Sequence, residues 1–193
     1  MRSPVVELFA DLAAVLDAAR VPWYLFGAQA AIIHGAARLT ADVDVTIQLP
    51  AAMSSGALVQ ALEERGFQRR IADPGLIERS RVIPLVHVAT ALPLDVVIAG
   101  PGLEEQFFER AQTREIDGVP VRIASAEDVV VMKVLAGRPK DVEDVVVILA
   151  AQQEELDVGY VRHTLTLLEQ ALAQRDLLPV FEDALARAAS GPH

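Results

Sequence analysis

The sequence predicts an α+β protein, with a sheet-containing core followed by a C-terminal region of helices. Segments with strand-like patterns are confined to residues 23–123, whereas the helical spacing of apolar residues dominates afterwards. The chain has 193 residues, a length that suits one compact core with a helical extension. We therefore expect a core at residues 1–124 and a helical region at residues 125–193.

Local signals place the helices and strands in the first half of the core. Ser3 followed by Pro4 is typical of a helix start, because serine caps the first turn and proline fits the first helical position. From Asp42 to Leu49 polar and apolar residues alternate, which predicts a half-buried strand. In chain order we expect a helix from Pro4 that ends at Val21-Pro22, a strand over 23–26, a helix over 28–36, a strand over 42–49 and a helix from Ser54-Ser55 to Gly66.

Similar signals continue through the rest of the chain. Asp117-Gly118 between two extended runs predicts a hairpin, and Ser125 with Asp128 resembles a capping box at the start of a helix. In chain order we expect at least two strands within 67–98, the clearest over 82–88 and 94–98, then a helix over 103–111, hairpin strands over 113–116 and 119–123, and helices over 125–136, 139–152, 157–174 and 177–189.

Composition excludes several classes of protein. The 27 acidic residues outnumber the 17 lysines and arginines, and a net charge of −10 argues against coating nucleic acid non-specifically. Cysteine is absent, so there is no disulfide and no thiolate nucleophile. No uncharged apolar stretch approaches the roughly 18 residues of a membrane span, and the N-terminal segment carries acids where a signal peptide is apolar. We expect a cytoplasmic protein without a membrane contact, and part of its 52% hydrophobic residues could cover a homodimer interface.

Two aspartates separated by one residue form the most informative pattern. Asp42 and Asp44 project to the same side of their predicted strand, and two carboxylates this close repel each other unless a cation lies between them. Such oxygens suit Mg²⁺, which binds one or two carboxylates together with substrate phosphates. The junction of strand, Gly27 and helix before them offers backbone N–H groups to a phosphate. The alternative is an ordinary solvated strand face.

A third acid, Asp95, interrupts an otherwise apolar predicted strand. A carboxylate in such surroundings needs a partner or a metal, which makes Asp95 a candidate third ligand. Three carboxylates on adjacent strands would allow a two-metal site. The alternative is an aspartate at a strand end that caps a turn.

Two blocks of sequence together resemble the polymerase-β-like nucleotidyltransferase superfamily. The first is Gly27-Ala28 followed by Arg38-Leu39-Thr40-Ala41-Asp42-Val43-Asp44-Val45. The second, the run from Glu127 to Asp144, is similar to the AbiEii/MenT-like branch of toxin–antitoxin nucleotidyltransferases, in which a helix bearing Lys leads to an Arg and an Asp-x-x-Asp. The resemblance covers about residues 20–150 and implies a palm-like mixed sheet flanked by helices. The chain departs from it at Ala28, where the superfamily has Gly or Ser, and this removes a hydroxyl contact to phosphate.

The resemblance implies an enzyme that uses Mg²⁺ to move NMP from an NTP to an acceptor hydroxyl. By this analogy Asp42 and Asp44 hold Mg²⁺ and the triphosphate, and Asp95 binds a second metal or acts as a base on the acceptor hydroxyl. Lys133 would take part in catalysis by countering the charge of the phosphates. The implied nucleotide-binding residues are Gly27, Ala28, Arg38, Thr40, Lys133 and Arg138.

Lys133 also has a plain structural explanation. Its predicted helix presents one apolar face, and Lys133 lies at the edge of that face, where its stem can cross apolar surface. From there its ammonium either reaches the triphosphate or extends to solvent. The residues of the apolar face are Val129, Met132 and Ala136.

Other charged residues leave similar choices open. Arg138 and Lys140 are either solvated charges at a helix end or further phosphate contacts, and Asp141 and Asp144 are expected to orient these cations rather than to bind metal. Residues 65–81 hold five arginines against two acids, so this segment could steer an anionic substrate, or it is a solvated loop.

The acceptor stays open between three classes. The toxin–antitoxin resemblance suggests a tRNA end or a partner protein, whereas the acidic charge favours a protein or a small cationic molecule of the aminoglycoside type over RNA. A second class of function is a nucleotide- or partner-binding module that keeps the fold without turnover, which the missing hydroxyl at Ala28 supports.

Overall fold

The computed structural model describes residues 2–37, 39–71, 73, 75–153, 155–173 and 175–190. The chain divides into two compact units. The first comprises residues 1–29 and 40–124, and the second comprises residues 30–39 and 125–193. None of the helices in the described residues is both long and apolar enough to cross a membrane.

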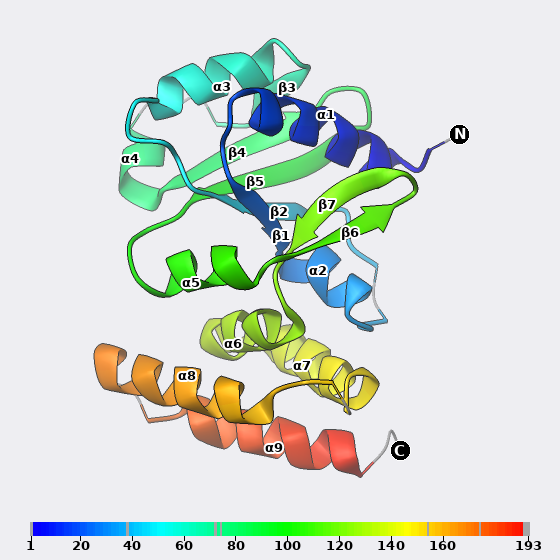
Figure 1. The fold of residues 1–193 in the computed structure, drawn as a ribbon, viewed down its shortest axis with the longest axis vertical. Helices are drawn as coiled ribbons and strands as arrows, with labels where there is room; N and C mark the ends of the chain where they lie inside the picture. Colours follow the sequence, from blue (N-terminus) through cyan, green and yellow to red (C-terminus); the bar gives the residue numbers. More distant parts are fainter. Residues whose placement is uncertain are drawn as a thin grey trace. The chain divides into compact units, whose positions relative to one another are not determined.

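A mixed sheet forms the centre of the first unit and confirms the predicted α+β class (Figure 1). Within the described residues, seven strands pair in the order β3-β4-β5-β2-β1-β7-β6. β2 runs parallel to β5 and β1 parallel to β7, whereas the other neighbours are antiparallel. The strands are β1 (Trp23–Phe26), β2 (Val43–Ile47), β3 (Phe67–Arg69), β4 (Val82–His87), β5 (Leu92–Ile98), β6 (Gln112–Ile116) and β7 (Val119–Ile123).

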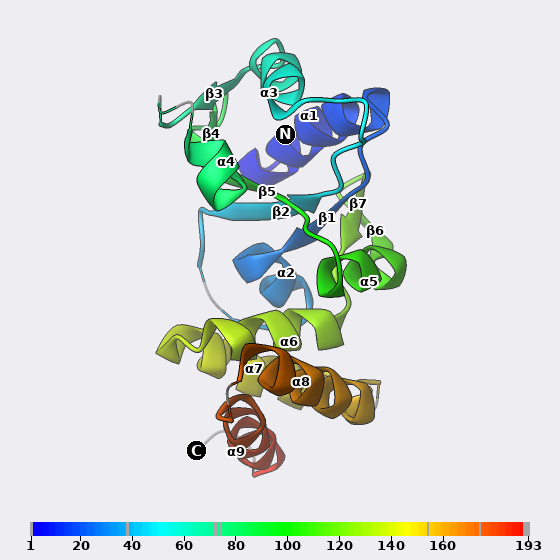
Figure 2. The ribbon, with the colours of Figure 1, turned by 90° about the vertical axis from the view of Figure 1, so that its left-hand side faces the viewer.

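Helices cover both faces of this sheet. In Figure 2, α1 and α3 lie on one side of the sheet and α5 lies on the other. α1 packs through an apolar stripe of Leu8, Leu12 and Leu16, none of which is exposed. On the opposite side the ring of Tyr24 in β1 contacts the ring of Phe108 in α5, with 4.8 Å between their centroids. The helices of this unit are α1 (Pro4–Ala18), α3 (Ser55–Glu63), α4 (Leu76–Ser80) and α5 (Leu103–Arg110). α2 (Gly27–Ile33) begins in this unit and ends in the second.

Two local predictions are confirmed by the backbone. Asp117 and Gly118 both have positive φ, 47° and 79°, so they form the tight turn that joins β6 to β7. The hydroxyl of Ser54 accepts a hydrogen bond of 3.1 Å from the N–H of Ala57 and caps α3.

The prediction that residues 65–81 form a solvated loop is wrong in part, because β3 and α4 lie within this segment. Phe67 of β3 is fully buried, and its ring packs on the ring of His87 in β4, with 4.8 Å between the two centroids. A strand of three residues is too short to show an alternation in the sequence, and a helix of five residues is too short to show a helical period.

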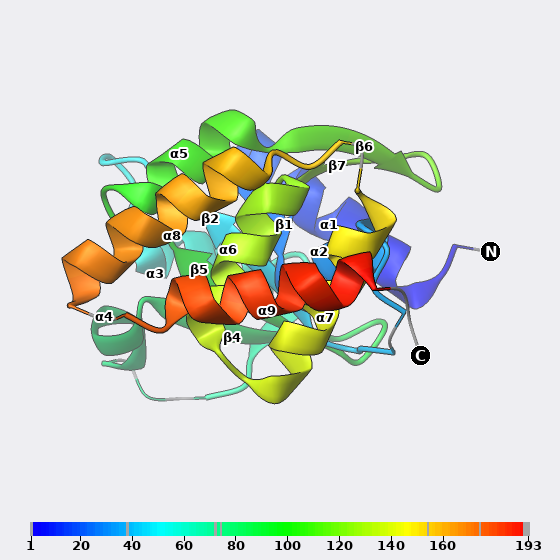
Figure 3. The same cartoon turned by 90° about the horizontal axis from the view of Figure 1, so that it is seen from below.

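The second unit contains the expected run of helices after residue 125. α6 contacts α7, α8 and α9, and α9 also contacts α7 and α8. Figure 3 shows these helices from below. At the start of α6 the hydroxyl of Ser125 accepts a hydrogen bond of 3.2 Å from the N–H of Asp128, and the Asp128 carboxylate accepts one of 2.8 Å from Tyr160. Their bounds are α6 (Ala126–Ala136), α7 (Pro139–Ala151), α8 (Val158–Leu172) and α9 (Leu177–Ala189).

A short segment from early in the chain, residues 30–39, also belongs to the second unit. The backbone carbonyl of His34 accepts a hydrogen bond of 3.3 Å from Nε2 of Gln152. Gly35 has a φ of 116°, and a methyl group there would lie 2.6 Å from the side chain of Ala151. Glycine at position 35 therefore allows α2 to end and the chain to pass close to α7.

Candidate active site

Two of the predicted site residues are neighbours on the central strands of the sheet. Asp44 on β2 is paired with Asp95 on β5 in a parallel register. Paired residues on adjacent strands project to the same face, and the strands are about 4.8 Å apart, so the two carboxylates lie side by side. Asp95 stands in the middle of β5, between the fully buried Leu94 and Val96, rather than at a strand end.

The backbone of Gly27 lies against the carboxylate of Asp44. Phe26, the last residue of β1, pairs with Asp44, and Gly27 follows with a φ of 68°. A methyl group built on Gly27 would lie 2.8 Å from Cγ of Asp44, closer than real side chains approach. Glycine is needed here for two reasons: the left-handed backbone and the space that the Asp44 carboxylate occupies.

Replacing Gly27 by alanine should lower the rate of nucleotide transfer by about 10²-fold, because the new methyl group must push Asp44 out of place by an ångström or so. Steady-state kinetics on the folded variant would measure this loss. Gly118→Ala is the matched control: it also has positive φ, yet nothing lies within 4 Å of the added methyl group. Equal rates for the two variants would contradict the role of the Gly27–Asp44 contact.

The loop before β2 positions Asp42. Asp42 lies one residue before the strand, is exposed, and its backbone N–H donates a hydrogen bond of 3.2 Å to the hydroxyl of Thr40. Nε2 of Gln29 donates to the backbone carbonyl of Thr40 at 3.4 Å and so ties this loop to the first turn of α2. Arg38, predicted to bind nucleotide, lies outside the described residues.

Asp95 carries a partner that the sequence did not single out. The guanidinium of Arg70 forms an ion pair with Oδ1 of Asp95. Arg70 was only one of five arginines in the segment 65–81, and its pairing depends on the register of β3 with β4. The only available signal was the local excess of positive charge in this segment.

The carboxylates of Asp42 and Asp44 are of the chemical type that binds a magnesium ion. Carboxylate oxygens are hard ligands, and Mg²⁺ binds one or two of them together with phosphates and water. Within the part of the chain that the structure describes, no group of three or more Asp, Glu or His side chains is arranged to hold a metal ion.

Lys133 and Arg138, the two predicted phosphate contacts of the second unit, belong to a cluster of charged residues. Lys133 is only 5% exposed, and its Nζ lies 3.2 Å from Oδ1 of Asp141 and 2.6 Å from Oδ2 of Asp144. Nη2 of Arg138 lies 3.3 Å from Oδ1 of Asp141. Asp141 holds Arg138, as the sequence predicts, whereas the pairing of both aspartates with Lys133 was not predicted. The cluster ties α6 to α7.

The expected apolar face of α6 needs a correction. Ala136 is exposed and Met132 is half-buried, whereas Lys133 is itself buried next to Val134. The ammonium of Lys133 therefore does not extend to solvent. Burial of the lysine is possible because two carboxylates of α7 pair with its ammonium. The spacing of apolar residues within α6 could not predict this, because the carboxylates lie on another helix.

Acid should weaken the second unit through Asp141. Burial alone would raise the pKa of Asp141, but the hydrogen bond from Arg138 and the charge of Lys133 outweigh it and hold the pKa below its ordinary value. A carboxyl with a lowered pKa in the folded state stabilises the fold above about pH 4, and this contribution is lost as the pH falls through the folded-state pKa. In urea unfolding, the stability gap between wild type and Asp141→Asn should narrow as the pH falls from about 5 to about 3.

A gap between wild type and Asp141→Asn that stays constant across this range would contradict the assignment.

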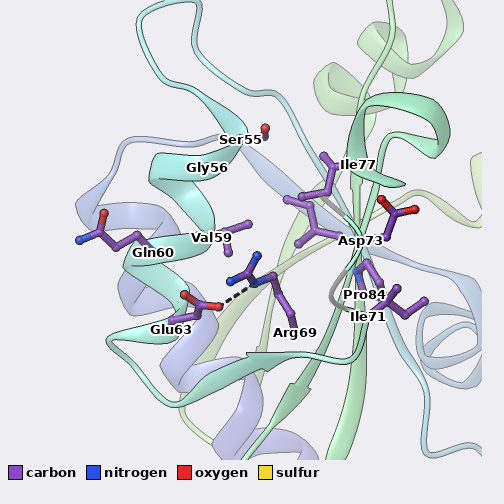
Figure 4. A pocket seen from close by; sticks show the side chains of 11 residues that line it. Ser55, Gly56, Val59, Gln60, Glu63, Arg69, Ile71, Asp73, Ile77 and Pro84 are labelled. Atoms are coloured by element: carbon purple, nitrogen blue, oxygen red, sulfur yellow. Dashed lines mark hydrogen bonds and ion pairs between the residues drawn. The ribbon is translucent and has the colours of Figure 1, made fainter. Parts of the chain in front are cut away.

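A pocket of about 240 Å³ lies between α3, α4 and the edge of the sheet (Figure 4). The charged residues that line it are paired: Arg69 donates to Glu63 at 2.8 Å, and Asp73 pairs with Arg79, which lies outside the lining. Pro84 of β4 lines the pocket and is also the register partner of Asp95. One wall residue of the pocket therefore lies on β4, the strand next to the one that carries Asp95.

A mixed sheet with carboxylates side by side on central strands, next to a strand–glycine–helix junction, defines a nucleotidyltransferase, an enzyme that transfers nucleotidyl groups. The chain belongs to the family described as nucleotidyltransferase of unknown function (DUF6036), whose model matches residues 4–176. This family description supports the predicted superfamily and names no AbiEii/MenT-like branch. No curated protein sequence is similar enough to this one to count as a match.

Solved structures of nucleotidyltransferases share the fold. An antigenic nucleotidyltransferase-like protein from Paracoccidioides brasiliensis matches with a TM-score of 0.57 and 17% identity over 91% of both chains. The antibiotic-resistance factor ANT(2″)-Ia in solution matches with a TM-score of 0.61 and 18% identity over 90% of this chain and 97% of that one. The crystal structure of ANT(2″)-Ia in complex with adenylyl-2″-tobramycin matches with a TM-score of 0.56 and 18% identity, over 83% of this chain and 94% of that one. At these identities the similarity shows a common fold.

Proposed function

We propose that this enzyme uses Mg²⁺ to transfer NMP from an NTP to a hydroxyl group of an acceptor, with release of pyrophosphate. The observation that carries the proposal is the pairing of Asp44 with Asp95 beside Gly27, in a chain of a nucleotidyltransferase family.

The aspartates of the first unit would perform the reaction. Asp42 and Asp44 would hold the ion and, through it, the triphosphate. A bound Mg²⁺ supplies positive charge to the phosphate oxygens, where negative charge develops during transfer. Asp95 would either bind a second ion or accept the proton of the acceptor hydroxyl as its oxygen attacks the α-phosphorus and the bond to pyrophosphate breaks.

Backbone and basic groups would bind the nucleotide. Gly27 brings backbone without a side chain next to Asp44, and the loop of Thr40 positions Asp42. Ala28 is assigned to the nucleotide by family resemblance. Lys133 is assigned to the triphosphate by family resemblance, although in the structure it is paired with Asp141 and Asp144. Arg38 and Arg138 are assigned to the nucleotide on the same ground.

The acceptor is the least constrained part of the proposal. The likeness of residues 127–144 to the AbiEii/MenT-like branch favours a tRNA end or a partner protein in a toxin–antitoxin system. The fold shared with ANT(2″)-Ia, and a net charge of −10, favour a small cationic acceptor of the aminoglycoside type instead.

The test is transfer of label from each of the four NTPs, labelled at the α-phosphate, in the presence of Mg²⁺. Parallel mixtures contain total RNA, RNA-free lysate protein or an aminoglycoside, and each is repeated with the metal chelated and with Asp44→Asn. Metal-dependent label on one acceptor class, absent with Asp44→Asn, supports the proposal and names the acceptor class. Labelled transfer that persists without metal would contradict it.

A second candidate is a module that binds nucleotide without turnover. The specific feature that favours it is Ala28, which replaces the superfamily's Gly or Ser. Nucleotide binding in every mixture, with no transfer in any, would support this alternative. Ala28→Ser would then be expected to restore transfer if the missing hydroxyl is the cause.

A further inference from the structure

One row of residues crosses three strands of the sheet and ends at Arg70, one residue beyond a fourth. The register pairs Asp44 on β2 with Asp95 on β5, and Asp95 with Pro84 on β4. The backbone N–H of Arg70, one residue after β3, donates to the carbonyl of Pro84 at 2.9 Å. Residues of one row project to one face of the sheet, so Arg70 lies on the same face as the two carboxylates.

The backbone of Arg70 is held two strand spacings, roughly 10 Å, from that of Asp95. Only a long side chain covers this span, and the short proline ring at position 84 leaves its path open. The guanidinium ends on Oδ1 of Asp95, with both side chains a little over one third exposed. The ion pair therefore depends on sheet register rather than on two mobile surface side chains meeting by chance.

The position of this guanidinium has a chemical meaning. In a two-metal site Asp95 would be a ligand of a second ion, about 4 Å from the first. At Asp95 that side already carries a permanent positive charge, because arginine is not deprotonated in proteins. A second divalent cation would have to displace the guanidinium and would be repelled by it.

We propose that Arg70 supplies at Asp95 the positive charge of a second metal, so that the nucleotide-loaded enzyme holds one divalent ion, at Asp42 and Asp44. This inference rests on the proposed function. It leaves Oδ2 of Asp95 to accept the hydrogen bond, and then the proton, of the acceptor hydroxyl. Arg70 acts through Asp95 and is a positioning residue.

The test counts Mn²⁺ bound to the protein, by the loss of the free-ion EPR signal, with a non-hydrolysable NTP analogue present. Wild type is expected to bind one ion per chain. Arg70→Met keeps the length of the side chain but removes its charge, and is expected to bind two. Arg70→Lys restores the charge and is expected to bind one.

Arg69→Met is the matched control. Arg69 is adjacent in sequence but pairs with Glu63 rather than with Asp95, so this variant should still bind one ion. Asp44→Asn should lose the wild-type ion, which assigns that ion to the first site. Circular dichroism on each variant verifies that it is folded. The number of Mn²⁺ ions bound to the wild-type protein tests the proposal even if a variant fails to fold.

Each contrary result has a different meaning. Two ions on wild type, or one ion on a folded Arg70→Met, would overturn the role of Arg70 and leave the proposed function standing. No nucleotide-dependent ion on wild type would overturn both.

Discussion

Asp42→Asn and Asp44→Asn should each remove nucleotide transfer while leaving the fold intact. Both carboxylates are assigned to the same ion, and an amide offers one neutral oxygen in place of a charged ligand. Loss of that ion should raise the barrier by several kcal/mol, which is a loss of 10²-fold or more in rate. Each substitution is nearly isosteric and lies on a partly exposed side chain, so the sheet should be unaffected.

The measurement is the rate of label transfer by the purified variants, with circular dichroism to verify the fold. Asp17→Asn, on an exposed carboxylate of α1, is the matched control and should transfer at the wild-type rate. If both variants keep more than about a tenth of the wild-type rate, the assignment of the metal to these two residues fails.

Lys133→Ala should have two separable effects. It leaves Asp141 and Asp144 buried without their shared cation, and breaking a buried ion pair in this way typically costs about 3–5 kcal/mol of folding stability. If the resemblance also assigns Lys133 correctly to the triphosphate, kcat of the folded variant should fall by about 10²-fold or more, with Mg²⁺ affinity nearly unchanged.

Urea unfolding measures the first effect and single-turnover kinetics on folded protein measures the second. Lys140→Ala removes an exposed lysine from the same region and should change neither. Unchanged stability would contradict the buried cluster. Transfer by folded Lys133→Ala at the wild-type rate would show that the lysine only ties α6 to α7, and the family assignment would fail at this position.

The carboxylates of the site could be predicted because each stands out locally. Asp95 interrupts an apolar strand, and Asp42 and Asp44 were predicted to share one face of another, although the structure leaves Asp42 one residue before that strand. That Asp44 and Asp95 are paired is confirmed by the register, although their roles stay predictions. The hairpin at Asp117-Gly118 was equally local.

What could not be predicted depends on contacts that are distant in sequence. The pairing of Arg70 with Asp95 requires the register of three strands, one of which is only three residues long. The burial of Lys133 requires α7 to bring two carboxylates to it. The segment 30–39 joins the helices of the second unit through contacts such as that of His34 with Gln152, more than a hundred residues away.

The placement of residues 30–39 has a consequence for how the chain folds while it is being made. This segment leaves the ribosome early, but its partners in the second unit come from residues after 125. Until those residues emerge, the backbone of His34 and Gly35 lacks its neighbours Gln152 and Ala151. Joining residues 30–39 to the residues after 125 closes a long loop, which costs chain entropy. We therefore expect the second unit to assemble late, after residues 30–39 have already been synthesised.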